Sequence, residues 1–398
     1  MIYWKTTMPD NAIMPTYFSQ MQIAFTRGRG IWLWDTENIK YLDSFAGVAV
    51  CNLGHSHPEV TKTIIKQSKL LLHTSNNFRI LNQEKLADKL TKVAGMEQAF
   101  FCNSGAEANE VALKLTRIYA RKKGIQNPVV VTMKNSFHGR TFATLSASGL
   151  ERLQVGFEPI LSGFTYVTLN DIGELQKLAA ENTNIVAIML EPIQGDGGLF
   201  AATKEYLNFI RSLCDKNDWL MILDEVQTGI GRTGKWFGYQ NYDIIPDVIT
   251  NAKALANGFP MGVCLVRGKA CNLFAPGKHG TTFGGSPIIC AIALSVLETI
   301  EKLDLLKHTE EVGQYLRDKL QQKLASKVVA IRGWGLMFGV ELPKNCLSIS
   351  NIGLKYQILL NVVNNNTVRL LPALIINERQ VDDLVRRLVK TIDEFLLS

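Results

Sequence analysis

Short apolar runs alternate with longer amphipathic stretches through the middle of the chain. The runs predict buried strands at residues 98–102, 128–133, 184–190, 219–223 and 247–250. The stretches between them predict helices at residues 107–123, 171–180 and 204–217. Strands that alternate with helices form a mainly parallel sheet with helices on both faces. We therefore predict an α/β fold.

The pattern differs at the two ends of the chain. Residues 31–35 and 40–43 predict a hairpin, and a loop then leads to a helix near residues 59–72. After Pro287 come long helices, a strand pair within residues 328–342 and a closing helix at residues 378–397. We predict that residues 51–286 form a large domain and residues 287–398 a smaller α+β domain, which residues 1–50 join.

Composition narrows the class of protein. The chain has 398 residues, 46% of them hydrophobic, which is enough for sizeable cores. It shows no uncharged stretch of membrane-spanning length and its first ten residues do not resemble a signal peptide, so we predict a cytoplasmic protein. The seven cysteines lie apart, mainly in apolar runs, and the spacing of His55 and His57 does not suit a metal. We predict reduced thiols and no metal site.

Charge adds little. The surplus of seven positive charges is spread along the chain, which favours a site for small anions over a nucleic-acid surface.

Two charged residues follow predicted strands. Asp224 comes after the run at 219–223, and Lys253 after the run at 247–250. Open α/β sheets bind ligands at the carboxyl ends of their strands. A partly desolvated lysine can form a Schiff base with a carbonyl, and an aspartate can hold a protonated heterocycle; pyridoxal phosphate needs both. Taken singly, each residue is more often a cap or a solvated surface group.

A rival motif overlaps this region. Residues 229–235 spell G-x-x-x-x-G-K, as in a phosphate-binding loop, but Trp236 stands where such a loop needs Ser or Thr for magnesium. We regard this rival as weak.

Two further segments could bind anions or a ring. Gly105 and Ala106 lie between a strand and a helix, where their N–H groups could point at a phosphate. Phe137 could cover a pyridine ring, and Arg140 could grip a carboxylate. Taken alone, the first segment is more often an ordinary strand-to-helix turn, and the second a packed aromatic with a surface arginine.

Glu191 and Arg369 form a possible pair. Glu191 follows a predicted strand, and Arg369 lies within an apolar run, where a buried arginine needs a partner. Either Glu191 or a substrate carboxylate could be that partner. Residues 279–285 add hydroxyls and glycines in a loop.

Taken together, these segments resemble the class III (ornithine/acetylornithine) aminotransferases of fold type I, which use pyridoxal phosphate. The resemblance runs from the Tyr17 region to Arg369. It rests on the segments NSGAEANE, FHGRT, EPIQGDGG, LDEVQTGIGRTG, AKALANGFPMG, HGTTFGG and RLLPALI. A chance match to all seven is very improbable.

The resemblance implies roles around the cofactor. Lys253 would link covalently to pyridoxal phosphate and then move a proton between substrate and cofactor, while Asp224 would keep the ring nitrogen protonated. The other implied cofactor contacts are Gly105, Ala106, Phe137, Glu225, Val226, Gln227 and Thr282. Because Thr282 would come from the neighbouring subunit, the resemblance implies a homodimer with shared active sites.

It also implies how substrates bind. Arg140 would hold the distal carboxylate of glutamate or 2-oxoglutarate and the α-carboxylate of an acylated ornithine. Arg369 would hold the α-carboxylate of glutamate, Glu191 would pair with Arg369 when the other substrate is bound, and Thr281 would touch acetylornithine. The reaction implied is transamination of N2-acetylornithine with 2-oxoglutarate, in arginine biosynthesis.

Several alternatives stay open at this point. Succinylornithine, free ornithine or 4-aminobutyrate could be the donor, although aliphatic Val48, where ornithine aminotransferases tend to carry an aromatic, favours acetylornithine. An aminomutase of the same fold is disfavoured by the presence of both Arg140 and Arg369. A binding module without catalysis would have no need of Lys253 together with Asp224. The chain departs from the family at residues 18–22 and at Asn257.

Overall fold

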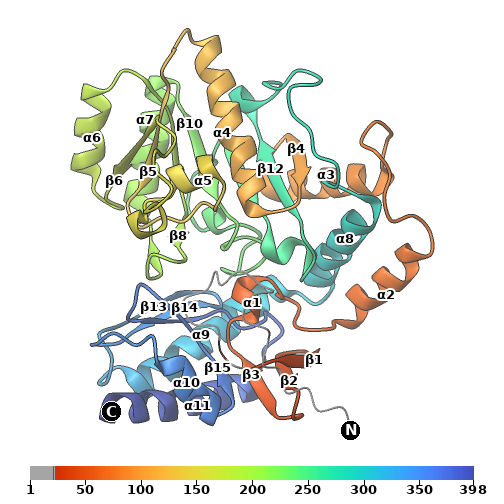
Figure 1. The fold of residues 1–398 in the computed structure, drawn as a ribbon, viewed down its shortest axis with the longest axis vertical. Coiled ribbons are helices and arrows are strands. Elements are labelled where there is room, and N and C mark those ends of the chain that lie inside the picture. The colour runs from red at the N-terminus through yellow and green to blue at the C-terminus, as the bar shows by residue number, and fades with distance from the viewer. Residues whose placement is uncertain (1–20, 22) are drawn as a thin grey trace.

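A seven-stranded sheet forms the centre of the larger part of the molecule (Figure 1). The computed structural model describes residue 21 and residues 23–398, so Tyr17 and most of segment 18–22 lie outside the described residues. The strand order is β4-β12-β11-β10-β7-β5-β6. All neighbours are parallel except β12, which is antiparallel to both β4 and β11. The bounds are β4 (Gln98–Cys102), β5 (Val129–Met133), β6 (Phe164–Val167), β7 (Ile185–Leu190), β10 (Leu220–Asp224), β11 (Val248–Asn251) and β12 (Gly262–Val266).

Helices cover both faces of this sheet. Successive side chains of a strand point to opposite faces. Leu220 and Ile222 of β10 therefore join one apolar cluster, with α4 (Gly105–Lys122), and Met221 and Leu223 join another, with α7 (Lys204–Asn217). The second cluster also includes side chains of α3 (Leu81–Ala94) and α6 (Ile172–Glu181). The predicted α/β fold with a mainly parallel sheet is confirmed.

A second layered region lies beside the first (Figure 1). Its antiparallel sheet has the order β13-β14-β17-β16, and helix α9 packs against α11 and β13. The bounds are α9 (Leu305–Leu324), β13 (Ala330–Trp334), β14 (Met337–Glu341), α10 (Ile349–Lys355), β16 (Asn361–Val363), β17 (Thr367–Leu370) and α11 (Glu378–Leu397). The predicted strand pair and closing helix are confirmed.

The N-terminal strands share a sheet with this C-terminal region. Hairpin strands β1, β2 and β3 are followed in the sheet by β15, which pairs in parallel with β3. Helix α8, which begins at Pro287, packs against α2 and α3. The domain boundaries themselves stay a prediction. The bounds are β1 (Phe25–Arg29), β2 (Trp32–Asp35), β3 (Lys40–Asp43), α2 (Pro58–Ser68), α8 (Pro287–Lys302) and β15 (Ile358–Leu359).

The segment after β3 makes an unusual turn toward the centre of the molecule. In α1 (Ala46–Ala49), every residue has a positive φ, which is costly for branched Val48 at +66°. Asp43 caps this turn, because its Oδ1 accepts hydrogen bonds from the N–H groups of Phe45 (3.1 Å) and Ala46 (2.8 Å). Burial lowers the pKa of His55, but its 2.7 Å contact with Asp43 outweighs this effect and raises the pKa to about 9. His55 thus belongs to the support of this turn.

No helix in the described part of the chain is long and apolar enough to cross a membrane. All seven cysteines are free thiols.

Candidate active site

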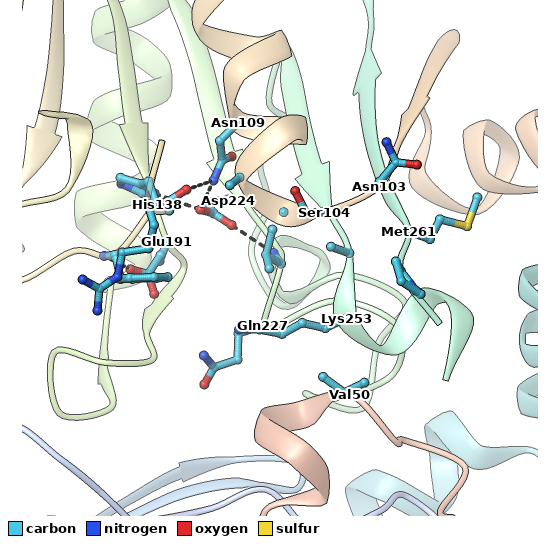
Figure 2. Close-up of a pocket in the computed structure, with 18 of the residues that line it drawn as sticks. Val50, Asn103, Ser104, Asn109, His138, Glu191, Asp224, Gln227, Lys253 and Met261 are labelled. Atoms are coloured by element: carbon cyan, nitrogen blue, oxygen red, sulfur yellow. Dashed lines mark hydrogen bonds and ion pairs between the residues drawn. The ribbon is translucent and has the colours of Figure 1, made fainter. Parts of the chain in front are cut away.

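A pocket opens where the carboxyl ends of the parallel strands meet (Figure 2). Its volume is about 450 Å³. The residues after β4, β5, β7, β10 and β11 supply most of its wall, and the loop before β12 and Val50 supply the rest. Open α/β sheets bind their ligands at this position. The sequence-predicted residues that line the pocket are Gly105, Ala106, Phe137, Arg140, Glu191, Asp224, Val226, Gln227 and Lys253.

Asp224 is held by a set of buried hydrogen bonds at the end of β10. Its Oδ2 accepts from Asn109 Nδ2 at 2.7 Å and lies 2.8 Å from His138 Nδ1, and its Oδ1 accepts from the N–H of Val226 at 3.0 Å. The hydroxyl of Thr250 in turn donates to Asn109 Oδ1 at 2.6 Å. Figure 2 shows Asn109 and His138 next to each other beside the carboxylate, both joined to it by dashed lines. These contacts fix the orientation of a carboxylate that is only 4% exposed.

Lys253 lies across the pocket at the start of the 3₁₀ turn η3 (Lys253–Ala256). Its φ of +44° is a strained value for a residue with a side chain, and such strain is commonly found at functional sites. Burial lowers the pKa of Lys253, an effect that the nearby carboxylate of Asp196 opposes and Arg369 reinforces. A lower pKa gives more of the neutral amine, which is the nucleophilic form.

The start of α4 forms the end of the pocket beside Val226. Ser104 caps the helix by accepting a hydrogen bond from the N–H of Glu107 at 3.1 Å. A Cβ atom on Gly105 would lie 2.8 Å from Val226 Cγ1, so this close approach requires glycine. The first N–H groups of a helix have no partner within it and favour anions. Gly105 and Ala106 can therefore bind a phosphate here.

Phe137 and Arg140 follow β5 and line the pocket. Arg140 is exposed, and its guanidinium lies 5.7 Å from the centroid of the Phe137 ring. An exposed arginine at the rim of a pocket can reach a carboxylate that enters from solvent.

Glu191 is bound by backbone groups. Its oxygens accept from the N–H groups of Phe137 at 2.7 Å and Gly195 at 2.8 Å. Burial raises the pKa of Glu191 to about 7, although these hydrogen bonds act in the opposite direction. Its carboxylate thus joins the loop after β5 to the loop after β7.

Arg369 on β17 has other partners. Its guanidinium donates to Asn361 Oδ1, to the carbonyl of Gly195 and to Gln227 Oε1, and lies 3.5 Å from Asp196 Oδ1. No ion pair joins Glu191 to Arg369, both of which the structure describes, and their pairing with the other substrate bound stays a prediction. Asp196 is the carboxylate that approaches this arginine.

Glu225, an implied cofactor contact, has buried partners of its own. It is fully buried and lies outside the pocket wall. Its carboxylate accepts from the N–H groups of Gly238 and Tyr239, both at 2.7 Å, and from the hydroxyl of Thr228. The side chain therefore fixes the loop after β10, and its contact with a cofactor stays a prediction.

The rival phosphate-binding loop is excluded. The segment from Gly229 to Trp236 consists of turns and leads into the 3₁₀ helix η2 (Gly238–Asn241), where a phosphate-binding loop would lead into an α-helix.

Thr281 and Thr282 do not line the pocket of their own chain. Thr281 Oγ1 accepts a hydrogen bond from Asn103 Nδ2 at 3.1 Å, and Thr282 is exposed.

The residues present fit pyridoxal phosphate. The pocket offers a buried lysine with a lowered pKa for an aldehyde, a fixed carboxylate for a ring nitrogen and a helix N-terminus for a phosphate. The glycine at the start of α4 lets Val226 pack directly against the first turn of this helix, which places Val226 beside the proposed phosphate position.

Sequence reasoning missed three polar residues of this site: Asn109, His138 and Asp196. All three lie within the motifs quoted for the resemblance, but none had an assigned role. Their importance depends on contacts between separate segments, which a local motif does not show.

Comparisons with known proteins agree with this geometry. The family model described as "Aminotransferase class-III" matches residues 13–392. The acetylornithine aminotransferase of Nitrosomonas europaea is 45% identical over 388 residues, which cover 97% of this chain and 98% of that protein. The acetylornithine aminotransferase of Caldanaerobacter subterraneus is 44% identical, with coverage of 98% and 99%.

Solved structures are similar over almost the whole chain. The ornithine aminotransferase of Toxoplasma gondii superposes with a TM-score of 0.91 at 29% identity, covering 95% of this chain and 92% of that chain. The N-acetylornithine aminotransferase of Stenotrophomonas maltophilia gives a TM-score of 0.83 at 33% identity, covering 95% and 97%. The chain therefore belongs to the class-III aminotransferases, fold-type-I enzymes whose cofactor is pyridoxal phosphate.

Proposed function

We propose that the protein transfers the terminal amino group of N2-acetylornithine to 2-oxoglutarate, giving N-acetylglutamate 5-semialdehyde and glutamate in arginine biosynthesis. The observation that carries this proposal is the similarity, over nearly the full length of both chains, to two proteins named acetylornithine aminotransferase. The two arginines of the site support it, because 2-oxoglutarate has two carboxylates and N2-acetylornithine has one.

The catalytic roles fall to the two sides of the pocket. When bound, pyridoxal phosphate supplies an electron sink that stabilises negative charge on the substrate carbon. Lys253 Nζ would take the proton from the substrate carbon that bears the amino group and would then deliver it to the cofactor. Asp224 keeps a proton on the ring nitrogen, and Asn109 and His138 hold the carboxylate in place for that task.

The remaining contacts hold the cofactor. The N–H groups of Gly105 and Ala106 bind the phosphate, joined by the partner subunit's Thr282. Phe137 and Val226, which line the pocket, would hold the ring of the cofactor between them, and Gln227 would contact its phenolic oxygen.

The arginines bind and distinguish the substrates. Arg140, at the exposed rim, holds the α-carboxylate of N2-acetylornithine and the distal carboxylate of glutamate. Arg369 holds the α-carboxylate of glutamate. Asp196, whose Oδ1 lies 3.5 Å from Arg369 Nη1 in this structure, is the carboxylate that stays beside Arg369 when acetylornithine occupies the pocket. Thr281 touches the acetylornithine bound in the partner's site.

A homodimer with shared active sites in the cytoplasm completes the proposal. Apolar side chains are exposed on two neighbouring segments, at Leu70, Leu71, Leu72, Phe78, Leu81 and Phe283. Asn76 joins these segments by donating to the carbonyls of Thr281 and Gly284, both at 3.1 Å. An apolar surface that continues to the loop of Thr282 is suited to cover by a second copy of the chain.

The test is the visible spectrum of the purified holoenzyme, recorded before and after N2-acetylornithine is added without any keto acid. We expect the absorbance of the bound cofactor to convert to that of its amino form with this donor, and far more slowly with ornithine, succinylornithine or 4-aminobutyrate. A cofactor band that responds to one of the other donors and not to N2-acetylornithine would overturn the substrate assignment.

A further inference from the structure

Arg369 has a side chain opposite it on only one of the two neighbouring strands. In the register of the sheet, Asn361 of β16 lies opposite Arg369 on one side, and Gly339 of β14 lies opposite it on the other. Residues directly opposite each other on antiparallel strands point to the same face. Asn361 is therefore the cross-strand partner of Arg369. Gly339 adds no side chain, and a Cβ atom there would lie 2.9 Å from Leu199 Cβ.

The contacts divide the guanidinium of Arg369 into two edges. Along one edge, Asn361 Oδ1 accepts from Nε at 2.9 Å and from Nη2 at 2.7 Å. At the other edge, Nη1 donates to the carbonyl of Gly195 at 3.1 Å and to Gln227 Oε1 at 3.2 Å. Gln227 lines the pocket, so this second edge faces the substrate side.

The partner on the first edge is neutral. An amide oxygen orients a guanidinium through hydrogen bonds but leaves its positive charge uncompensated. A carboxylate in the same place would orient the group and also cancel its attraction for a substrate carboxylate. Asp196, the single carboxylate within 4 Å of this guanidinium among the described residues, lies at the other edge.

The geometry points to Asn361 as the positioning residue of Arg369: it fixes the Nε and Nη2 edge without adding a second counter-charge to that of Asp196, and so presents the Nη1 edge to the α-carboxylate of glutamate or 2-oxoglutarate. This inference rests on the proposed function for the substrate that Arg369 binds. It adds a specificity residue from β16 that has no contact with the cofactor pocket.

The experiment compares Asn361→Ala and Asn361→Asp with a matched control, Asn365→Asp. Asn365 lies in the exposed turn between β16 and β17, so the control adds the same charge to the same hairpin away from Arg369. Each half-reaction is measured separately on the holoenzyme by the absorbance of the bound cofactor. Binding of glutarate, which has both carboxylates but no amino group, is measured in parallel by calorimetry.

Loss of the amide in Asn361→Ala should raise the KM for glutamate and the Kd for glutarate about tenfold, with kcat little changed. The added carboxylate in Asn361→Asp should raise both about 100-fold, because it competes for the charge of Arg369. The half-reaction with N2-acetylornithine should stay close to that of the unmodified enzyme in both variants, and the control should match it throughout.

Two results would overturn the inference. One is an unchanged KM for glutamate and an unchanged Kd for glutarate in both Asn361 variants. The other is an equal loss in both half-reactions together with a lower melting temperature, because a purely structural role would have that effect. Failure of the proposed function is distinct: the unmodified enzyme would then be inactive with N2-acetylornithine, while the glutamate half-reaction would still report on Asn361.

Discussion

Two aspartates face Lys253, and the protein holds them in opposite ways. Asp224, at the end of β10, is 4% exposed and accepts hydrogen bonds from Asn109 and from the N–H of Val226 while also contacting His138. Asp196, in the turn between β8 (Ile193–Gln194) and β9 (Phe200–Ala201), has a side chain that is 30% exposed and a single long contact to Arg369. In the proposed function Asp224 keeps one partner, the ring nitrogen, through the reaction, and a fixed orientation suits that role. Asp196 has to give way to a substrate carboxylate, and a loosely held side chain suits that role.

The two aspartates also depend on different parts of the fold. The contacts of Asp224 come from α4, from the loop after β5 and from the loop after β10, so the large sheet and its covering helix determine them. The turn that carries Asp196 packs on the smaller sheet, where the guanidinium of Arg332 donates to the carbonyl of Gly198 at 2.9 and 3.1 Å. The contacts of the proposed cofactor carboxylate thus lie around one sheet, and those of the proposed substrate-binding residues lie between two sheets.

The largest effect is expected for Asp224→Asn. The amide keeps the shape but cannot supply the negative charge that holds a proton on the ring nitrogen, so kcat should fall about 10³-fold. The matched control is Glu225→Gln, a neighbouring buried carboxylate outside the pocket. It should lower the melting temperature and leave kcat within a few-fold. Steady-state rates and thermal unfolding of both variants check this, and similar losses of kcat in both would contradict the comparison.

Asp196→Asn should have a smaller and opposite effect on one substrate. Removing the carboxylate nearest to Arg369 leaves its charge free for 2-oxoglutarate, so the KM for this acceptor should fall about tenfold. The half-reaction with N2-acetylornithine should become slower, because Arg369 then lacks a counter-charge. The two half-reactions, measured separately, give the answer. A higher KM for 2-oxoglutarate would show that Asp196 helps to bind the acceptor and does not compete with it.

The same variant should change the titration of Lys253. Burial lowers the pKa of this lysine, and the carboxylate of Asp196 opposes that effect by favouring the ammonium form. In protein freed of cofactor, the pKa of Lys253 should therefore lie below the ordinary lysine value, and Asp196→Asn should lower it further. Competitive labelling with an amine reagent across a pH series measures both. A midpoint that rises in the variant would mean that Asp196 does not act on Lys253.

The sequence predicted the residues proposed to act on the cofactor better than the contacts of those proposed to bind the substrate. Asp224 and Lys253 follow short apolar runs that are buried strands in the structure, and position relative to a strand end is a local property. Strand β12 was not predicted, because a run inserted antiparallel between β4 and β11 has no local mark of its pairing. The contacts of Arg369 with Asp196 and Asn361 depend on register and on packing between sheets, which local patterns do not specify.

The smallest expected effect on kcat concerns two buried threonines of the same sheet, Thr250 and Thr132, which should respond differently to replacement by valine. Thr250 on β11 donates to Asn109 Oδ1, whereas the hydroxyl of Thr132 on β5 has no hydrogen-bond partner within the described residues; both residues are fully buried. Thr250→Val should free Asn109 to rotate away from Asp224 and lower kcat about threefold to fivefold, the value of one ordinary hydrogen bond.

Thr132→Val removes a polar group that gains nothing from burial, so it should raise the free energy of unfolding by about 1 kcal/mol and leave kcat unchanged. Chemical unfolding and steady-state rates of both variants distinguish the two sites. Equal effects on kcat would mean that the sheet as a whole, and not the bond from Thr250 to Asn109, holds Asp224 in place.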